Sequence, residues 1–254
     1  MKSSRTQNLA LLCTVVFGFG CSAAYSQITV ACAANMQFAM QQIDSAFVKH
    51  GGNAKVVYGA SGNLATQIKN GAPFDVFVSA DRTYPDSIHS WKLSADAPQV
   101  YAFGKLVLWS LKPGLAEKGM AGLKDPMVKA IALADPAHAP YGRESIRALK
   151  KSGIYDSVSK RLVFGENISQ AAQYVVTGAA DIGFFAKAIV LSDQMKGKGA
   201  WRDVDSALYY KIAQGVVICK HGADANADVS RRFVTFLLGS ESRAILTKFG
   251  YSLP

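Results

Sequence analysis

Residues 28–80 decide the fold, and their runs read ITVACA (28–33), MQFAMQQIDSAFVKH (36–50), AKVVYG (54–59), NLATQIKNG (63–71) and FDVFVSA (74–80). In the second run the apolar side chains recur at helical spacing, at Ala39, Met40, Ile43, Ala46 and Phe47. The first, third and fifth runs are short and rich in β-branched or aromatic residues, which is typical of strands. The order therefore predicts a βαβαβ unit, with a parallel sheet and helices on both of its faces.

The same alternation restarts after residue 104. KLVLWSL (105–111) leads through a Gly- and Pro-containing stretch to further strands and helices, which read AIALADP (130–136), SIRALKKSG (145–153), RLVF (161–164), SQAAQYVVTGA (169–179) and DIGFF (181–185). QGVVICK (214–220) has the pattern of a returning strand, and two amphipathic helices follow it, in SRRFVTFLLG (230–239) and ESRAILTKFG (241–250). We therefore expect an α/β protein of two lobes, each a mostly parallel sheet flanked by helices, joined by two crossover strands.

The expected boundaries place a first part of lobe 1 at 27–104 and lobe 2, with the first crossover strand, at 105–213. Residues 214–254 then supply the return strand and the helices that complete lobe 1. Ligands of α/β folds bind beyond the carboxyl ends of the strands, so the loops that lead into helices are the places to search.

Residues 1–26 have the layout of a secretory signal peptide. Lys2 and Arg5 precede the apolar run LALLCTVVFGFG, and small residues lead to Ser26, so the mature chain would begin near Gln27. About a dozen apolar residues are fewer than the roughly 20 that a spanning helix needs. Lipid attachment at Cys21 is a less favoured alternative, because Gly18 and Phe19 do not fit a lipid-attachment motif. We expect a periplasmic protein.

The charge of the chain favours an anionic ligand. The whole sequence carries 28 Lys and Arg against 18 Asp and Glu, and removal of Lys2 and Arg5 leaves 26 minus 18, or +8. The basic residues are scattered, with KK at 150–151, KR at 160–161 and RR at 231–232 as the only doublets, so a nucleic-acid surface is not indicated. A general positive field would instead attract a small anion.

Two cysteines remain after the signal segment. Cys32 and Cys219 belong to an exported chain, where a disulfide is permitted, but both lie in apolar strand-like runs, where buried inert thiols are common.

Four strand-to-helix junctions carry small or hydrogen-bonding residues, at 33–36 (AANM), 59–63 (GASGN), 140–142 (PYG) and 166–169 (ENIS). The first N–H groups of a helix have no partner within it, and such helix ends bind anions without charged side chains. Each junction alone is explained by helix capping, since Asn35, Ser61 and Asn167 are good capping residues. Together, from both halves of the chain, the four junctions predict one anion-binding cleft.

Catalytic and metal-binding patterns are weak. The four histidines are not at metal-ligand spacing with one another or with a cysteine, and GxSxG, P-loop and GxGxxG motifs are absent from the sequence. His138 could serve as a general base, although a loop histidine is the simpler interpretation. Tyr209 and Tyr210 are a pair of the kind that binds ferric iron in some exported proteins, but neighbours in a strand point to opposite faces.

At these loops the sequence resembles the periplasmic molybdate-binding proteins that serve an ABC importer, over essentially the whole chain after Ser26. The likeness lies in ITVACAANMQFAMQQI (28–43), ASGNLATQIKNGAPFDVFVSAD (60–81), DPAHAPYG (135–142) and GENISQAAQYVVTGAADIGF (165–184), of which the second is the most specific. The resemblance implies a type II periplasmic binding-protein fold that closes around a dehydrated tetrahedral oxyanion. It implies molybdate and tungstate as ligands, an ABC permease as partner, no cofactor, no catalysis and a monomer.

The resemblance also implies an oxyanion site made of neutral donors, which we carry over to Ala34, Asn35, Ser61, Tyr141 and Ile168. Any metal would be present only as molybdenum in the oxyanion. Two positions depart from the familiar pattern, because Asn35 stands where serine is common and Ala186 stands where a tyrosine is common. Tyr141 could supply the missing hydroxyl, and Pro136 and Pro140 would stiffen the turn that presents it.

Other hypotheses remain at this stage. The same fold could receive sulfate, ferric iron or a small organic anion, and for a carboxylate Arg143 would be the arginine beside the site. A secreted hydrolase using His138 with Ser61 or Tyr141 is a different class, and the sensory domain of a transcription regulator is another. The secretory segment and the lack of a helix-turn-helix pattern argue against the last.

Overall fold

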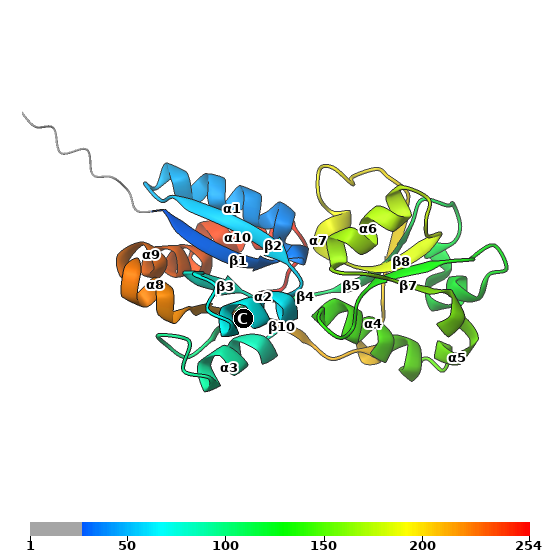
Figure 1. Ribbon diagram of the computed structural model, residues 1–254. Coiled ribbons are helices and arrows are strands. Elements are labelled where there is room, and N and C mark those ends of the chain that lie inside the picture. The colour runs from blue at the N-terminus through cyan, green and yellow to red at the C-terminus, as the bar shows by residue number, and fades with distance from the viewer. Residues whose placement is uncertain (1–26) are drawn as a thin grey trace, which may run out of the picture.

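The computed structural model describes residues 27–254, and the expected signal segment 1–26, with Cys21, lies outside the described residues. Two five-stranded sheets with flanking helices form two lobes side by side (Figure 1). Lobe 1 contains the blue and cyan elements together with the orange and red ones, and lobe 2 contains the green and yellow elements. No helix within residues 27–254 combines the length and apolar character needed to cross a membrane.

The sheet of lobe 1 has the strand order β2-β1-β3-β10-β4. Its elements are β1 (Ile28–Ala33), a 3-10 turn η1 (Ala34–Met36), α1 (Gln37–Lys49), β2 (Ala54–Gly59), α2 (Ser61–Lys69), β3 (Val76–Val78), α3 (Thr83–Ser90), β4 (Gln99–Gly104), β10 (Ile212–Ile218), α8 (Lys220–Ala225), α9 (Ala227–Leu238) and α10 (Ser240–Lys248).

The sheet of lobe 2 has the order β7-β6-β8-β5-β9. Its elements are β5 (Leu106–Ser110), η2 (Ala116–Lys124), β6 (Ile131–Ala134), α4 (Pro140–Lys151), α5 (Tyr155–Val158), η3 (Ser159–Arg161), β7 (Leu162–Gly165), α6 (Ile168–Val176), β8 (Ile182–Ala186), α7 (Lys187–Val190), β9 (Ala200–Asp203) and η4 (Ser206–Leu208).

The sheets confirm the two-lobed α/β prediction and refine it. β1 is parallel to β2 and β3, and β6 is parallel to β7 and β8, as the βαβ pattern predicts. β10 is antiparallel to β3 and β4, and β5 is antiparallel to β8 and β9, so each sheet is mixed. The antiparallel strands are those next to the two connections between the lobes.

The two connections are of different kinds. β4 ends at Gly104 and β5 begins at Leu106, so the chain passes from one sheet to the other through Lys105 alone. The return connection between β9 and β10 is longer and contains η4. Because both connections run between the sheets, they are the natural pivot for opening the cleft.

The lobes are closed on each other. The buried apolar cluster of lobe 2 continues across the cleft into four alanines of lobe 1, which are Ala33, Ala34, Ala60 and Ala80. Closure brings the carboxyl ends of β1, β2 and β3 against the loops of lobe 2, so the place where α/β folds bind ligands is buried.

Both cysteines are free and buried. Cys32 lies in β1 and Cys219 directly follows β10, and β3 separates these two strands in the sheet. Burial raises the pKa of both thiols, that of Cys219 to about 12, so they are unreactive core residues.

Candidate functional site

A small cavity lies between the lobes, where η1 and the helices α2, α4 and α6 begin. It is lined by Ala33, Ala34, Asn35, Gly59, Ala60, Ser61, Ala80, Ala139, Pro140, Tyr141, Asn167 and Ile168. The cavity is small and has no room for a large organic molecule. Of the described residues that surround it, none carries a charged side chain.

All five residues proposed from the sequence line this one cavity. Each is at most 4% exposed, and they come from both lobes, as Ala34, Asn35 and Ser61 on lobe 1 and Tyr141 and Ile168 on lobe 2. A buried polar group loses free energy unless it finds a hydrogen-bond partner, so the partners of each group decide what the cavity can hold.

Ser61 presents a hydroxyl proton to the cavity. Its Oγ accepts the N–H of Ala80 at 3.0 Å, and the hydroxyl donates to no acceptor within residues 27–254. The helix α2 begins at Ser61 itself, after Ala60 as its N-cap, so Ser61 does not cap the helix with its side chain. The Ala80 contact occupies a lone pair and leaves the proton for a ligand.

Tyr141 is held in the same way. The side-chain amide of Gln214 donates to the Tyr141 hydroxyl at 3.3 Å, and within the described chain the hydroxyl donates to no acceptor. Burial raises the pKa of Tyr141 well above its ordinary value, the nearby Tyr251 and Tyr209 raise it further, and the Gln214 bond opposes them. The phenol therefore stays protonated at neutral pH and can act as a donor.

Gly142 follows Tyr141 in the first turn of α4. A Cβ at Gly142 would lie 2.0 Å from the carbonyl oxygen of Ala134, so this glycine lets α4 start against the end of β6. The close approach thus involves the protein backbone, and it fixes the position of Tyr141 one residue earlier.

Asn35 is part of a buried polar network. Its Nδ2 donates to Oε1 of Gln214 at 2.9 Å and to the hydroxyl of Tyr251 at 3.0 Å, while its Oδ1 has no partner in the described chain. Tyr101 also donates to Oε1 of Gln214, at 2.7 Å. The side-chain donors of Asn35 are therefore used within the protein, which leaves its backbone N–H as its donor to the cavity.

Backbone N–H groups complete the set of donors. Those of Asn35, Ser61, Tyr141 and Ile168 lie in the first turn of η1, α2, α4 and α6, and none has an acceptor among residues 27–254. Asn167 is a helix cap, since its side chain accepts the N–H groups of Ser169 and Gln170. The helix ends direct their partial positive charge to the cavity.

Residues behind the alternative hypotheses are engaged elsewhere. Arg143 pairs with Asp81 outside the cavity lining. The ring of His138 bonds neither Ser61 nor Tyr141 within the described chain, and only its carbonyl oxygen contacts Gly62. Ala186 is buried at the start of α7 and does not line the cavity either.

The tyrosine pair does not form an iron site. The Tyr209 hydroxyl accepts the N–H of Leu106 at 3.3 Å, and Tyr210 is exposed, with the guanidinium of Arg147 3.8 Å from its ring centroid. Neither tyrosine lines the cavity.

Sequence reasoning did not identify Gln214, Tyr101 and Tyr251, which surround the donors. Gln214 is a polar residue inside the apolar run of β10 and is completely buried. A buried glutamine in such a strand requires partners, and this is the feature of the sequence that could have pointed to it.

The chain is similar to proteins of one family. Residues 28–252 match the family model described as bacterial extracellular solute-binding protein. The molybdate-binding protein ModA of Azotobacter vinelandii is 37% identical over 236 residues, covering 92% of each chain. ModA of Rhodobacter capsulatus is 36% identical over 239 residues, which is 93% of this chain and 92% of the relative.

Solved structures agree in fold. The periplasmic molybdate-binding protein of A. vinelandii superposes with a TM-score of 0.84 at 33% identity, over 89% of this chain and 99% of that one. The sulfate-binding protein SubI of Mycobacterium tuberculosis has a TM-score of 0.74 at 14% identity, over 89% and 86% of the two chains, which shows a common fold alone.

Proposed function

Because the chain belongs to the family of bacterial extracellular solute-binding proteins, we propose that it captures molybdate in the cavity between its lobes and delivers it to an ABC importer. The relatives at 36–37% identity are named as molybdate-binding proteins and not as enzymes, which supports a role in binding rather than catalysis.

One observation carries the proposal. The buried cavity offers hydroxyl and N–H donors without a charged side chain, from Ser61 and Tyr141 and from the N–H groups of Asn35 and Ile168. Ala34, the first residue of η1, also lines the cavity and is the fifth member of the proposed set. A fully deprotonated tetrahedral oxyanion has only acceptors, so such a set satisfies it from several sides.

The same set would discriminate between oxyanions. Hydrogen phosphate carries a proton that needs an acceptor, and the proposed donors favour an anion without one. Oδ1 of Asn35 is the one side-chain acceptor without a partner among the described residues that line the cavity. Tungstate has the charge and shape of molybdate, and we propose that it binds as well. The ligand itself brings the only metal, as molybdenum or tungsten within the oxyanion, and we propose no cofactor.

The biological setting follows from the same family. We propose that residues 1–26 direct export to the periplasm and that the protein works there as a monomer, with a membrane permease as its partner. Soluble capture and hand-over require the lobes to open and close about the connections at Lys105 and between β9 and β10.

Calorimetric titration tests the proposal. Protein freed of ligand is titrated in turn with molybdate, tungstate, sulfate and phosphate. We expect tight one-to-one binding of molybdate and tungstate and far weaker binding of sulfate and phosphate. If sulfate or phosphate bound as tightly as molybdate, or if all four anions failed to bind, the proposed function would be wrong.

A further inference from the structure

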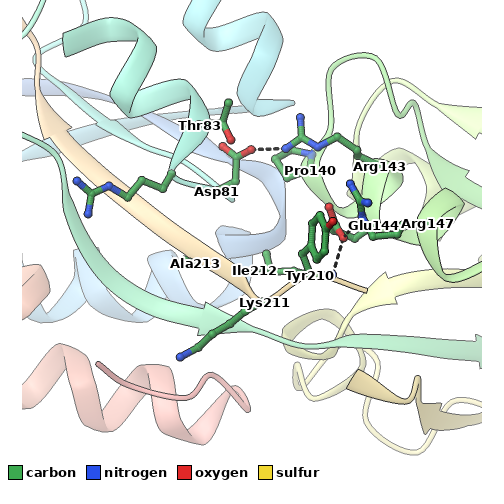
Figure 2. Close-up of a pocket in the computed structure, with 11 residues that line it drawn as sticks. Asp81, Thr83, Pro140, Arg143, Glu144, Arg147, Tyr210, Lys211, Ile212 and Ala213 are labelled. Carbon is green, nitrogen blue, oxygen red and sulfur yellow. Dashed lines mark hydrogen bonds and ion pairs between the residues drawn. The ribbon is translucent and has the colours of Figure 1, made fainter. Parts of the chain in front are cut away.

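A groove runs along the outside of the cleft, next to the buried cavity. It is lined by residues of both lobes, among them Asp81 of lobe 1 and Arg143 and Arg147 of lobe 2 (Figure 2). Arg82 of lobe 1 also lines the groove, and Pro140 lines both the groove and the cavity. Charged side chains of the two lobes therefore face each other in this groove, beside the proposed anion site.

One ion pair spans this groove. The guanidinium of Arg143 donates to Oδ2 of Asp81, as the dashed line between them in Figure 2 shows. Among the ion pairs within residues 27–254, this is the one whose partners belong to different lobes. When the cleft opens, this pair must separate.

Asp81 is fixed before Arg143 arrives. Its Oδ1 accepts the hydroxyl of Ser79 and the N–H of Tyr84, both at 3.3 Å, and these contacts lie within lobe 1. The Asp81 side chain is 11% exposed in the closed protein, whereas that of Arg143 is 35% exposed. These contacts hold the carboxylate in a defined position without help from Arg143, and the carboxylate is mostly buried when the lobes are closed.

The location of the carboxylate gives the pair a second effect. Asp81 directly follows Ala80, which lines the cavity and donates to Ser61, so a negative charge lies at the edge of an anion site. Arg143 lies two residues after Tyr141 on α4, and it neutralises this charge only when Tyr141 has reached the cavity. An unpaired buried carboxylate would cost free energy and repel the anion.

We propose that Asp81 and Arg143 form an electrostatic latch that holds the lobes closed and cancels a negative charge beside the captured anion. This inference rests on the proposed function for the identity of the anion. Both are positioning residues, because neither lines the cavity.

The latch predicts an unequal effect of its two halves. Arg143→Gln leaves the Asp81 carboxylate buried and unpaired in the closed state, whereas Asp81→Asn leaves a free guanidinium that can turn to water. Asparagine also keeps the Oδ1 acceptor for Tyr84. The double variant removes the unpaired charge, so it should bind molybdate more tightly than Arg143→Gln alone.

Arg82 provides a matched control. It is adjacent to Asp81 and lines the same groove, but it pairs with Asp86 on its own lobe at 3.1 Å. Arg82→Gln removes one positive charge from the same groove, as Arg143→Gln does, but it leaves the ion pair between Asp81 and Arg143 intact.

The first experiment measures the dissociation constant and the dissociation rate for molybdate. We expect Arg143→Gln to raise the dissociation constant about tenfold or more, mostly through faster release, and Asp81→Asn to raise it about threefold. Arg82→Gln should stay within about twofold of the wild type, the range expected for an exposed ion pair. Equal behaviour of Arg143→Gln and Arg82→Gln, or a double variant weaker than Arg143→Gln, would overturn the latch.

A second measurement separates the latch from the proposed function. Small-angle scattering of the anion-free proteins reports lobe separation, and we expect a larger radius of gyration for Arg143→Gln than for the wild type or Arg82→Gln. An unchanged radius overturns the latch whatever the ligand. Failure of the wild type to bind molybdate overturns the proposed function, and the scattering result then still decides on the latch.

Discussion

Gln214 donates its side-chain amide to the hydroxyl oxygen of Tyr141 at 3.3 Å, and this bond joins β10 of lobe 1 to the first turn of α4 in lobe 2. The bond occupies a lone pair of the phenol, so the phenolic proton is available to the cavity. A residue that does not line the cavity therefore determines the polarity of one that does.

Gln214→Glu should reverse that polarity. A carboxylate has no proton to donate, so it would accept the Tyr141 proton and turn the lone pairs of the hydroxyl toward the anion. We expect molybdate affinity to fall about 10- to 100-fold, the worth of a charge-assisted hydrogen bond. In a Tyr141→Phe background, Gln214→Glu should reduce molybdate affinity clearly less, because only the repulsion between the introduced carboxylate and the anion remains. Equal costs in both backgrounds, measured by calorimetry, would refute an effect through Tyr141.

Tyr141→Phe and Ser61→Ala each remove one donor from the cavity. We expect each to weaken molybdate binding by about 1.5–3 kcal/mol, the usual worth of a hydrogen bond to a charged group. Tyr210→Phe is the control, because Tyr210 is an exposed tyrosine outside the cavity. Calorimetric titration gives the affinities, and thermal denaturation without anion shows whether the variants keep their fold. An unchanged affinity for Tyr141→Phe would remove Tyr141 from the site.

Gly62→Ala should obstruct closure. A Cβ at Gly62 would lie 2.6 Å from the hydroxyl of Tyr84 and 2.9 Å from the carbonyl oxygen of His138 on the other lobe. Tyrosine can move, but the His138 backbone cannot without opening the cleft, so affinity should fall about tenfold or more. Alanine favours the helix α2, so the melting temperature of the anion-free protein should not fall. Gln67→Ala is the control, because Gln67 lies on the exposed face of the same helix.

Anion affinity should vary little with pH near neutrality. Tyr141 is the only titratable side chain among the described residues that line the cavity, and burial raises its pKa well above its ordinary value. A raised pKa means that the donor is lost only above that value, so it keeps its proton between about pH 6 and about pH 9. Titrations with molybdate over this range should agree within about threefold. A sigmoidal fall inside it would reveal another titrating group at the site.

Asp181 should stabilise lobe 2 at neutral pH. Burial raises the pKa of this carboxyl, but Lys112 and the N–H groups of Ala130 and Lys129 lower it more, so the pKa lies below its ordinary value. A lowered pKa gives stability that is present above the unfolded value of about 3.9 and is lost as the pH falls through the folded value.

Asp181→Asn should therefore reduce the free energy of unfolding by about 1–3 kcal/mol at pH 7, mainly through the bonds to the backbone. Urea denaturation at several pH values checks this, and the difference from the wild type should shrink in acid. A difference that stays constant down to about pH 2 would contradict the assignment.

The βαβ alternation was readable because it depends on local periodicity. β1, α1 and β2 combine strong hydrophobic patterns with short connections, and they lie where the sequence predicts them. β9 and α3 were not predicted, because β9 is mostly exposed and α3 contains Pro85 and has little apolar character. The insertion of β10 between β3 and β4 joins segments far apart in the chain, and local patterns cannot predict it.

The junctions around the cavity were predictable for a related reason, since helix starts are marked by small and polar residues. The partners of those groups were not. Gln214 is 179 residues from Asn35 along the chain, and Tyr251 is 216 residues from it, so only the fold brings them together. Gly239 ends α9 with an ordinary backbone φ of −75°, whereas Gly250 has a φ of +79°.

The discontinuous sheet of lobe 1 also has a consequence for the order of folding. All strands of lobe 2 lie between Leu106 and Asp203, whereas the sheet of lobe 1 is incomplete until β10 is present. Contacts between residues far apart in the chain form slowly. Lobe 2 should therefore fold before lobe 1 when the chain appears with its N-terminus first. The sheet of lobe 1 is then completed, and we expect the anion site, which needs both lobes, to form last, when Tyr251 reaches Asn35.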